Sequence, residues 1–332
     1  MDTRHSRISV PARTSICVLD MNQFHVGKAG GGNVGFALSA FTDVEVSESP
    51  NDEIANPDGT SWQDERRLIL THVLDQWRTA SHTRDSYRIV VHRVNPPHIG
   101  LAASAALQLV AWYGIAALYG PVSAEDLRAR IASSYRESIN GALVPGFTTG
   151  LSSFLGLVGG FAVVNPDLTP RSHMRVPNWT AAVVVEPSTR GLGFGEAEVQ
   201  TLTGRASQLD AAVRLTKDRL IDDALIPAVA SANLEAVGRT VHELQSMGSK
   251  VAEIEIYGDR ISRTLVILRS EVECAFMSAV GPGIVVLSNA SEDDLTALLS
   301  RLPVTIVWRG HVDNLGLTIN GQPVVGHNQQ SV

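Results

Sequence analysis

Apolar and polar positions alternate, or apolar residues cluster between turn residues, in several short stretches of the chain. Both patterns predict β-strands. A hairpin is also predicted around Gly159 and Gly160, because two adjacent glycines favour a tight turn. The predicted strands are residues 14–20, 36–46, 87–94, 181–186, 251–256, 284–287, 304–308 and 315–319.

In other stretches apolar residues recur every three to four positions, which predicts amphipathic helices. A helix is predicted to begin at Ser123, because Asp126 follows three residues later as in a capping box, and another at Ser291. The helices predicted from periodicity are residues 64–80, 217–230 and 234–247.

One stretch, residues 99–119, contains no charged side chain and is long enough to cross a bilayer. It is rich in Ala and Ser, contains Gln108, and follows Pro96 and Pro97. These features favour a helix buried within a globular protein.

Predicted strands and helices are mixed without a regular strand–helix–strand rhythm, which favours an α+β fold over a doubly wound sheet. Residues 138–166 carry no charge and are rich in Gly, Ser and Thr, as is typical of loops. We place a domain boundary just after them. It divides the chain into an N-terminal phosphate-loop domain of residues 1–168 and a C-terminal domain of residues 169–332.

Composition narrows the function classes. The 332 residues are 44% apolar and 18% charged, as in ordinary globular proteins. The net charge of −7 argues against nucleic-acid binding, which needs a basic surface. Cys17 and Cys274 lie far apart and indicate neither a disulfide framework nor a zinc site. Residues 1–13 lack the apolar segment of a signal peptide, so we expect a cytoplasmic protein without a membrane partner.

Residues 97–107 (PHIGLAASAAL) predict an anion-binding loop, because a strand, a turn of small residues and a long helix follow one another there. Small side chains let phosphate oxygens approach backbone amides, and the start of a helix carries partial positive charge. The alternative is that the small residues only allow close helix packing. The predicted donor-binding residues of this loop are Gly100, Leu101, Ala102, Ala103, Ser104 and Ala105.

Six segments in order along the chain carry a family resemblance: residues 13–22 (RTSICVLDMN), 31–35 (GGNVG), 98–101 (HIGL), 159–163 (GGFAV), 191–198 (GLGFGEAE) and 277–282 (MSAVGP). The loop at residues 97–107 resembles the second signature of the GHMP kinase superfamily. The six segments together resemble the β-ribofuranosylaminobenzene 5′-phosphate synthases, which share that fold. The resemblance implies a two-domain GHMP kinase-like α+β fold, with a ribosomal-S5-like N-terminal half and a ferredoxin-like C-terminal half.

The resemblance implies transfer of a phosphoribosyl group from 5-phosphoribosyl 1-pyrophosphate (PRPP) to the ring carbon of an aromatic carboxylate. Pyrophosphate and CO₂ leave, Mg²⁺ assists, and no organic cofactor is needed. Residues 100–106 (GLAASAA) depart from the GLGSGTQ of the aminobenzoate enzymes. They are more similar to the C-nucleoside synthases of formycin- and pyrazofurin-type antibiotic pathways, which implies 4-amino-pyrazole-3,5-dicarboxylate as the acceptor.

Three alternatives stay open at this point. In the first alternative, the protein is a β-ribofuranosylaminobenzene 5′-phosphate synthase whose acceptor is 4-aminobenzoate or 4-hydroxybenzoate. The second is an ATP-dependent GHMP kinase, which is disfavoured because residues 138–166 offer no carboxylate and residues 277–283 are not glycine-dense. The third is a protein that binds a phosphosugar without turnover. A homodimer is expected in each case.

The predicted catalytic residues are Lys28, Glu196 and His98. Lys28 is a cation among the glycines of residues 27–35 and suits pyrophosphate or a carboxylate. Glu196 matches a glutamate of the family. The alternatives are that Lys28 is a solvated loop lysine, that Glu196 only places a charge at the start of a helix, and that His98 has a structural role.

The resemblance implies that Ser104 and Glu137 bind Mg²⁺, and the alternative for Glu137 is a surface residue. Further donor-binding residues are Gly31, Gly32, Asn33, Thr148 and Thr149. Arg190 suits a carboxylate because its guanidinium can bind two oxygens at once. The other predicted acceptor-binding residues are His25, Ser152, Met277 and Ser278.

Overall fold

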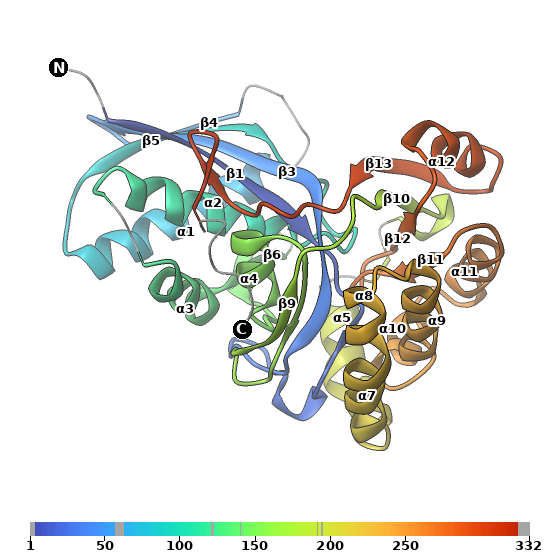
Figure 1. The fold of residues 1–332 in the computed structure, drawn as a ribbon. Coiled ribbons are helices and arrows are strands. Elements are labelled where there is room, and N and C mark those ends of the chain that lie inside the picture. The colour runs from blue at the N-terminus through green and yellow to red at the C-terminus, as the bar shows by residue number, and fades with distance from the viewer. Residues whose placement is uncertain are drawn as a thin grey trace.

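The computed structural model describes residues 4–56, 63–120, 123–139, 141–190, 192–193 and 195–324. In this part of the chain, strands gather into two larger sheets, each with helices packed against it (Figure 1). Nearly all strand pairs are antiparallel, and the exception is β4 with β5. The predicted α+β class is confirmed.

The first sheet has the order β15-β14-β1-β3-β5-β4. In addition, β2 and β8 pair with β3, and β9 pairs with β8. The long strand β3 alternates apolar and polar residues and pairs with β1 in a register that sets Ile8 opposite Val44. Its strands are β1 (His5–Arg13), β2 (Cys17–Val18), β3 (Asn33–Ser49), β4 (Glu53–Ala55), β5 (Ser86–Arg93), β8 (Phe161–Val164), β9 (Pro170–Met174), β14 (Thr318–Ile319) and β15 (Gln322–Pro323).

Helix α2 (Ala103–Ala117) is buried against β1 and β3 of this sheet and contacts α1 (Gln63–Ser81) and α4 (Leu151–Val158). Nearly every side chain of α2 is apolar, as expected for a helix with protein on all sides. The prediction of a buried helix is confirmed. Within the described ranges no helix is long and apolar enough to span a membrane. Helix α3 (Ala124–Ser134) begins as predicted, with the Ser123 hydroxyl accepting from the Asp126 amide.

The second sheet has the order β11-β12-β10-β13. One hydrophobic cluster contains Phe36 and Phe161 of the first sheet together with Val183 and Phe276 of the second, so the two sheets share a core. The strands are β10 (Thr180–Val185), β11 (Cys274–Met277), β12 (Gly283–Ser288) and β13 (Thr305–His311).

Helices α9 and α11 pack on β11, and α12 packs on β10 and β13. Two wider π-helical turns, η3 and η4, interrupt the helical stretch that precedes α9. The helical elements of this half are η2 (Pro187–Thr189), α5 (Glu196–Thr201), η3 (Leu202–Ala206), α6 (Ser207–Ala211), α7 (Arg214–Leu220), η4 (Ile221–Leu225), α8 (Ile226–Ala230), α9 (Leu234–Gln245), α10 (Ser249–Glu255), α11 (Asp259–Glu271) and α12 (Glu292–Leu299).

Three predictions of local structure are wrong. Residues 138–166, predicted as a loop, contain α4 and β8. Residues 251–256 form most of α10 and not a strand, because Glu253 is buried in an ion pair while its apolar neighbours Val251 and Ile254 are only half-buried. The sequence around Gly159 ends α4 and leads into β8, and the hairpin joins β8 to β9 further on.

The division at residue 168 stays a prediction. Strand β9 lies past this point and still pairs with β8 of the first sheet, and β14 returns from the second sheet to pair with β1. The expected homodimer also stays a prediction.

Candidate active site

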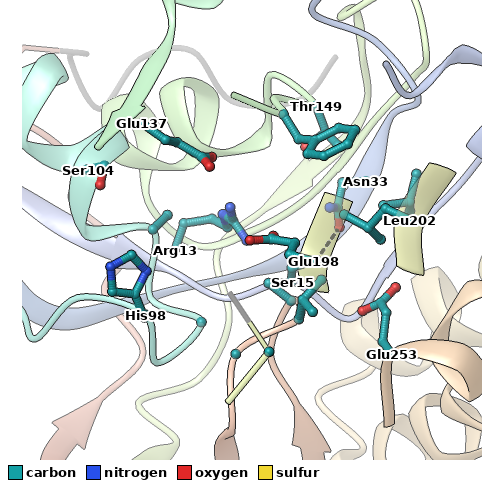
Figure 2. A pocket seen from close by; sticks show the side chains of 18 of the residues that line it. Arg13, Ser15, Asn33, His98, Ser104, Glu137, Thr149, Glu198, Leu202 and Glu253 are labelled. Carbon is teal, nitrogen blue, oxygen red and sulfur yellow. Dashed lines mark hydrogen bonds between the residues drawn. The ribbon is translucent and has the colours of Figure 1, made fainter. Parts of the chain in front are cut away.

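A cavity opens where loops of both sheets meet, with a space of about 970 Å³ including the part open to solvent. The side chains come from the ends of β1 and β3, the loop before α2, the short β6–β7 hairpin (Arg136–Ile139 and Ala142–Pro145), α5, α10 and the β11–β12 loop (Figure 2).

The predicted anion loop forms one side of this cavity. Ala102, Ala103 and Ser104 line it at the start of α2, and no side chain in the described part of the chain caps this helix start. The backbone of Ala102 is left-handed (φ 53°), which turns the chain sharply into the helix. Amides at such a start are suited to bind an anionic group.

Gly100 joins this loop to the β11–β12 loop. A Cβ atom at Gly100, whose φ is +81°, would lie 2.1 Å from the Ser278 carbonyl oxygen. The Ser278 hydroxyl donates to the Gly100 carbonyl (2.7 Å) and accepts from the Ser15 amide (3.0 Å). Gly100 and Ser278 therefore hold two walls of the cavity together, and a side chain at Gly100 would clash with protein before it met a ligand.

Arg13 lies at the centre of the cavity, between Glu137 and Glu198 in the view of Figure 2. Its Nε donates to the Ser152 hydroxyl (2.8 Å), while its Nη1 is buried and has no hydrogen-bond partner among the described residues. Burial lowers the pKa of Arg13 to about 10, and the nearby Tyr135, Glu137 and Glu198 oppose this shift. The guanidinium is still positively charged at neutral pH.

The pKa values of both glutamates beside Arg13 are raised. Burial raises the pKa of Glu137, against hydrogen bonds from the Tyr135 hydroxyl and the Phe147 amide and against the Arg13 charge. Burial raises the pKa of Glu198 well above its usual value, and the charges of Glu137 and Glu253 raise it further. The cavity thus contains carboxyl groups that hold protons more tightly than free glutamates do.

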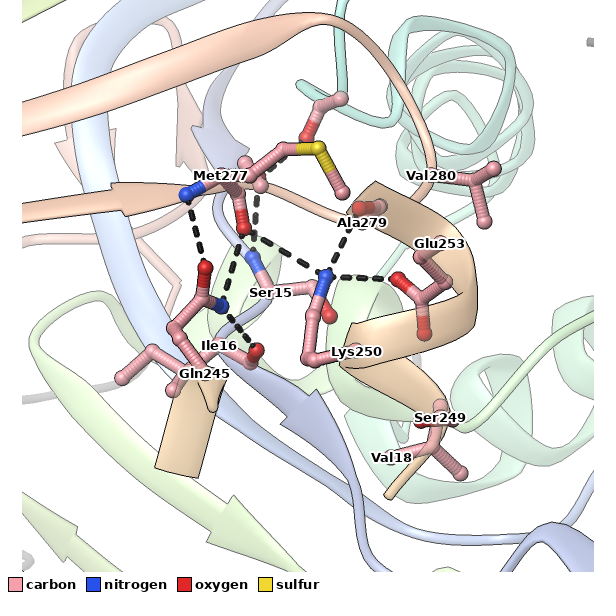
Figure 3. Close-up of polar contacts among 12 residues, drawn as sticks. Ser15, Ile16, Val18, Gln245, Ser249, Lys250, Glu253, Met277, Ala279 and Val280 are labelled. Carbon is pink, nitrogen blue, oxygen red and sulfur yellow. Dashed lines mark hydrogen bonds and ion pairs between the residues drawn. The ribbon is translucent and has the colours of Figure 1, made fainter. Parts of the chain in front are cut away.

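A third carboxylate, Glu253, lines the cavity from α10 and is fixed by the fully buried Lys250. The Lys250 ammonium donates to Glu253 Oε2 (2.7 Å) and to the Ala279 carbonyl (2.7 Å), as Figure 3 shows. Glu253 Oε1 is buried and finds no hydrogen-bond partner in the described structure. This network ties α10 to the β11–β12 loop.

Another part of the lining is apolar. The rings of Phe24 and Phe147 stack with centroids 4.7 Å apart, and Val18, Leu202 and Val280 line the cavity near them in the same hydrophobic cluster. In Figure 2, Leu202 lies on one side of Arg13 and Ser104 on the other. We call Val18, Phe24, Phe147, Leu202 and Val280 the apolar wall.

The structure brings part of the predicted site together. Burial lowers the pKa of His98, whose half-exposed ring faces Glu65. The Ser15 hydroxyl donates to the Asn33 side chain (3.0 Å). The predicted residues that line the cavity are Asn33, His98, Gly100, Ala102, Ala103, Ser104, Glu137 and Thr149.

Other predicted residues lie behind the lining or outside it. Ser152 contacts Arg13, and Leu101, Met277, Ser278, Gly31 and Gly32 are buried. Ala105 and Thr148 are half-buried. The exposed residues outside the lining are His25, Lys28, Arg190 and Glu196.

Sequence reasoning missed Arg13, Tyr135, Glu198 and Glu253. Arg13 and Glu198 lie within the segments 13–22 and 191–198 that carry the resemblance, but only Glu196 in these segments was predicted as a site residue. Glu253 was hidden in a stretch that alternates like a strand.

No group of three or more His, Cys, Asp or Glu side chains in the described ranges could hold a metal ion by itself. Ser104 and Glu137, the predicted Mg²⁺ ligands, line the same cavity and lie on one side of Arg13 in Figure 2. Magnesium is commonly bound by one or two protein oxygens together with substrate phosphates, so the two residues fit an ion that arrives with its ligand.

No family model matches the chain. It is 26% identical over 304 residues to beta-ribofuranosylphenol 5′-phosphate synthase of Archaeoglobus fulgidus, covering 86% of this chain and 88% of that protein.

Solved structures of small-molecule kinases share the fold. Mevalonate kinase of Methanococcus jannaschii superposes with a TM-score of 0.65 at 12% identity, covering 93% of this chain and 98% of the kinase. Homoserine kinase of Cytophaga hutchinsonii gives a TM-score of 0.61 at 13% identity, covering 96% and 98%. The chain therefore has the GHMP kinase-like α+β fold and is a distant relative of a beta-ribofuranosylphenol 5′-phosphate synthase.

Proposed function

We propose that the protein is an enzyme that transfers a phosphoribosyl group from PRPP to the ring carbon of an aromatic carboxylate, releasing pyrophosphate and CO₂. The observation that carries this proposal is the relationship to the archaeal synthase along most of both chains. Our preferred acceptor is 4-amino-pyrazole-3,5-dicarboxylate, and the product is then a C-nucleoside 5′-phosphate of antibiotic biosynthesis. The alternative acceptors are 4-aminobenzoate and 4-hydroxybenzoate.

The start of α2 suits the donor. PRPP carries several negative charges, and the uncapped amides beside Ala102, Ala103 and Ser104 offer hydrogen bonds to phosphate oxygens. Mg²⁺, held by Ser104 and Glu137 together with the pyrophosphate, would supply positive charge to the leaving group.

A decarboxylating transfer makes little demand on acid–base groups of the cavity. The bond from ribose C1 to pyrophosphate breaks as the ring carbon bonds to C1, and the ring then loses CO₂ and keeps that electron pair. Because CO₂ departs where other ring substitutions lose a proton, the reaction needs no general base. Neither Glu137 nor Glu198, which line the cavity, is therefore required to abstract a proton.

The kinase alternative is supported by the fold and by one feature of the site. Residues 138–166 lack a carboxylate, but Glu137, Glu198 and Glu253 line the cavity, so the argument from a missing carboxylate no longer applies. A kinase base must accept the proton of the attacking hydroxyl, and a raised pKa makes a glutamate a stronger base, so Glu137 and Glu198 are compatible with that role as well.

One incubation separates these functions. The protein is mixed with PRPP, Mg²⁺ and 4-amino-pyrazole-3,5-dicarboxylate, and pyrophosphate and CO₂ are measured together. Equal amounts of both are expected. ADP release from ATP in the presence of an alcohol substrate would support a kinase instead, and thermal stabilisation by PRPP without any product would indicate a binding protein.

A further inference from the structure

We propose that Arg13 binds a carboxylate that the acceptor keeps on its ring throughout the reaction, while the apolar wall contacts the ring itself. This inference rests on the proposed function and assigns the acceptor subsite within it. It replaces the exposed Arg190, which lies outside the lining, as the residue that recognises a carboxylate.

Arg13 has hydrogen-bonding capacity left over. Only its Nε has a described partner, the Ser152 hydroxyl at 2.8 Å, and that contact fixes the plane of the guanidinium. Nη1 is buried and without a partner among the described residues. Buried polar groups are nearly always hydrogen-bonded in native proteins, so a partner from a ligand is expected here. A carboxylate matches the geometry of a guanidinium because it can accept two parallel hydrogen bonds.

The charge of Arg13 also lacks a direct partner. The guanidinium stays protonated at neutral pH, and among the described residues no carboxylate forms an ion pair with it. A carboxylate of the acceptor supplies this counter-charge in the bound state.

The position of Arg13 fits an acceptor that lies beside the ribose. In Figure 2, Ser104 of the anion loop and Leu202 of the apolar wall lie on opposite sides of Arg13. The stacked rings of Phe24 and Phe147 belong to this wall. Aromatic and aliphatic side chains of this kind bind flat rings, and the cation next to them orients the ring through its carboxylate.

The carboxylate at Arg13 should be one that stays on the ring. Loss of CO₂ turns a charged group into a neutral one, so a bound cation stabilises the starting state more than the transition state and slows the step. A guanidinium therefore suits a second carboxylate that is not lost. The acceptor class that follows is a planar ring with two carboxylates.

Turnover of two matched acceptors tests the inference. kcat/KM is measured with 4-amino-pyrazole-3,5-dicarboxylate and with 4-amino-pyrazole-3-carboxylate. Arg13→Gln should lower the value for the dicarboxylate roughly ten- to a hundredfold, as expected for a lost charged hydrogen bond, and change the value for the monocarboxylate less than threefold. Arg13→Lys should recover part of the loss. Arg263→Gln, at an arginine whose side chain is 78% exposed on α11, is the matched control and should change neither value.

Calorimetric titration of wild type and Arg13→Gln with PRPP and with the dicarboxylate separates failure of this inference from failure of the proposed function. Unchanged PRPP affinity in the variant shows that the donor site is folded. Equal losses for both acceptors, or equal dicarboxylate affinity in the two proteins, would overturn the role of Arg13. Absence of turnover in the wild type, with dicarboxylate binding that still depends on Arg13, would refute only the transferase.

Discussion

Lys250→Met should lower the free energy of unfolding by about 3–5 kcal/mol, the usual effect of removing one partner of a buried ion pair. The Lys250 and Glu253 side chains are 1% and 2% exposed. Lys250 also donates to the carbonyls of Ala279 and Met277, so the substitution leaves a carboxylate and two carbonyls without this donor. Methionine fills a similar volume, and a cavity contributes little to the loss.

Urea unfolding followed by tryptophan fluorescence measures this difference. The control is Arg263→Gln, whose exposed pair with Asp259 should contribute at most about 1 kcal/mol. Lys250→Met combined with Glu253→Gln should recover much of the stability, because no unpaired charge then remains buried.

A loss in Lys250→Met no larger than in Arg263→Gln would refute this reasoning. It would mean that water reaches Glu253 in the free protein and that α10 does not depend on the pair. A large loss that Glu253→Gln fails to relieve would instead assign the effect to the Ala279 carbonyl of the β11–β12 loop, which loses its donor, since the Met277 carbonyl keeps the Gln245 amide.

Three further outcomes are expected. Ala103→Leu should weaken PRPP binding at least tenfold in calorimetry because Ala103 lines the cavity. The control, Ala117→Leu at the other end of α2, should leave PRPP binding unchanged. Normal PRPP binding by Ala103→Leu would show that the anion loop does not bind the donor. The raised pKa of Glu198 means that the native state keeps a proton that the unfolded state loses, so the free energy of unfolding falls as pH rises above about 4.5. Glu198→Gln should flatten this dependence in unfolding titrations, and an unchanged slope would contradict it. Burial raises the pKa values of Cys17 and Cys274 to about 11 and about 12, so neither thiol should react with a thiol reagent at pH 8 until the protein unfolds.

Periodicity in the sequence predicted much of the fold because it reflects burial directly. The predicted strand at residues 36–46 is the centre of β3, and the predicted helix at residues 64–80 is α1 within one residue at each end. Strand β1 was missed because its buried positions include Ser6, whose hydroxyl donates to the Gly114 carbonyl. A buried polar residue with a distant partner has no local signature.

The candidate site was predicted less completely, for a similar reason. The anion loop could be found because small residues before a helix form a local pattern. Arg13 and Glu253 take their importance from partners far along the chain, such as Ser152 and the Ala279 carbonyl. Lys28 appeared favourable from its glycine neighbours, yet its side chain is exposed and outside the lining, and its catalytic role stays a prediction.

The pairing of β14 with β1 has a consequence for biosynthesis. Ser9 lies opposite Thr318, so the ribosome must make most of the chain before this edge of the first sheet can form. Until then β1 exposes one row of unpaired backbone groups, which is a risk for aggregation. Contacts this distant in sequence also slow folding. A chaperone that shields this edge should therefore raise the yield of the protein made in a foreign host.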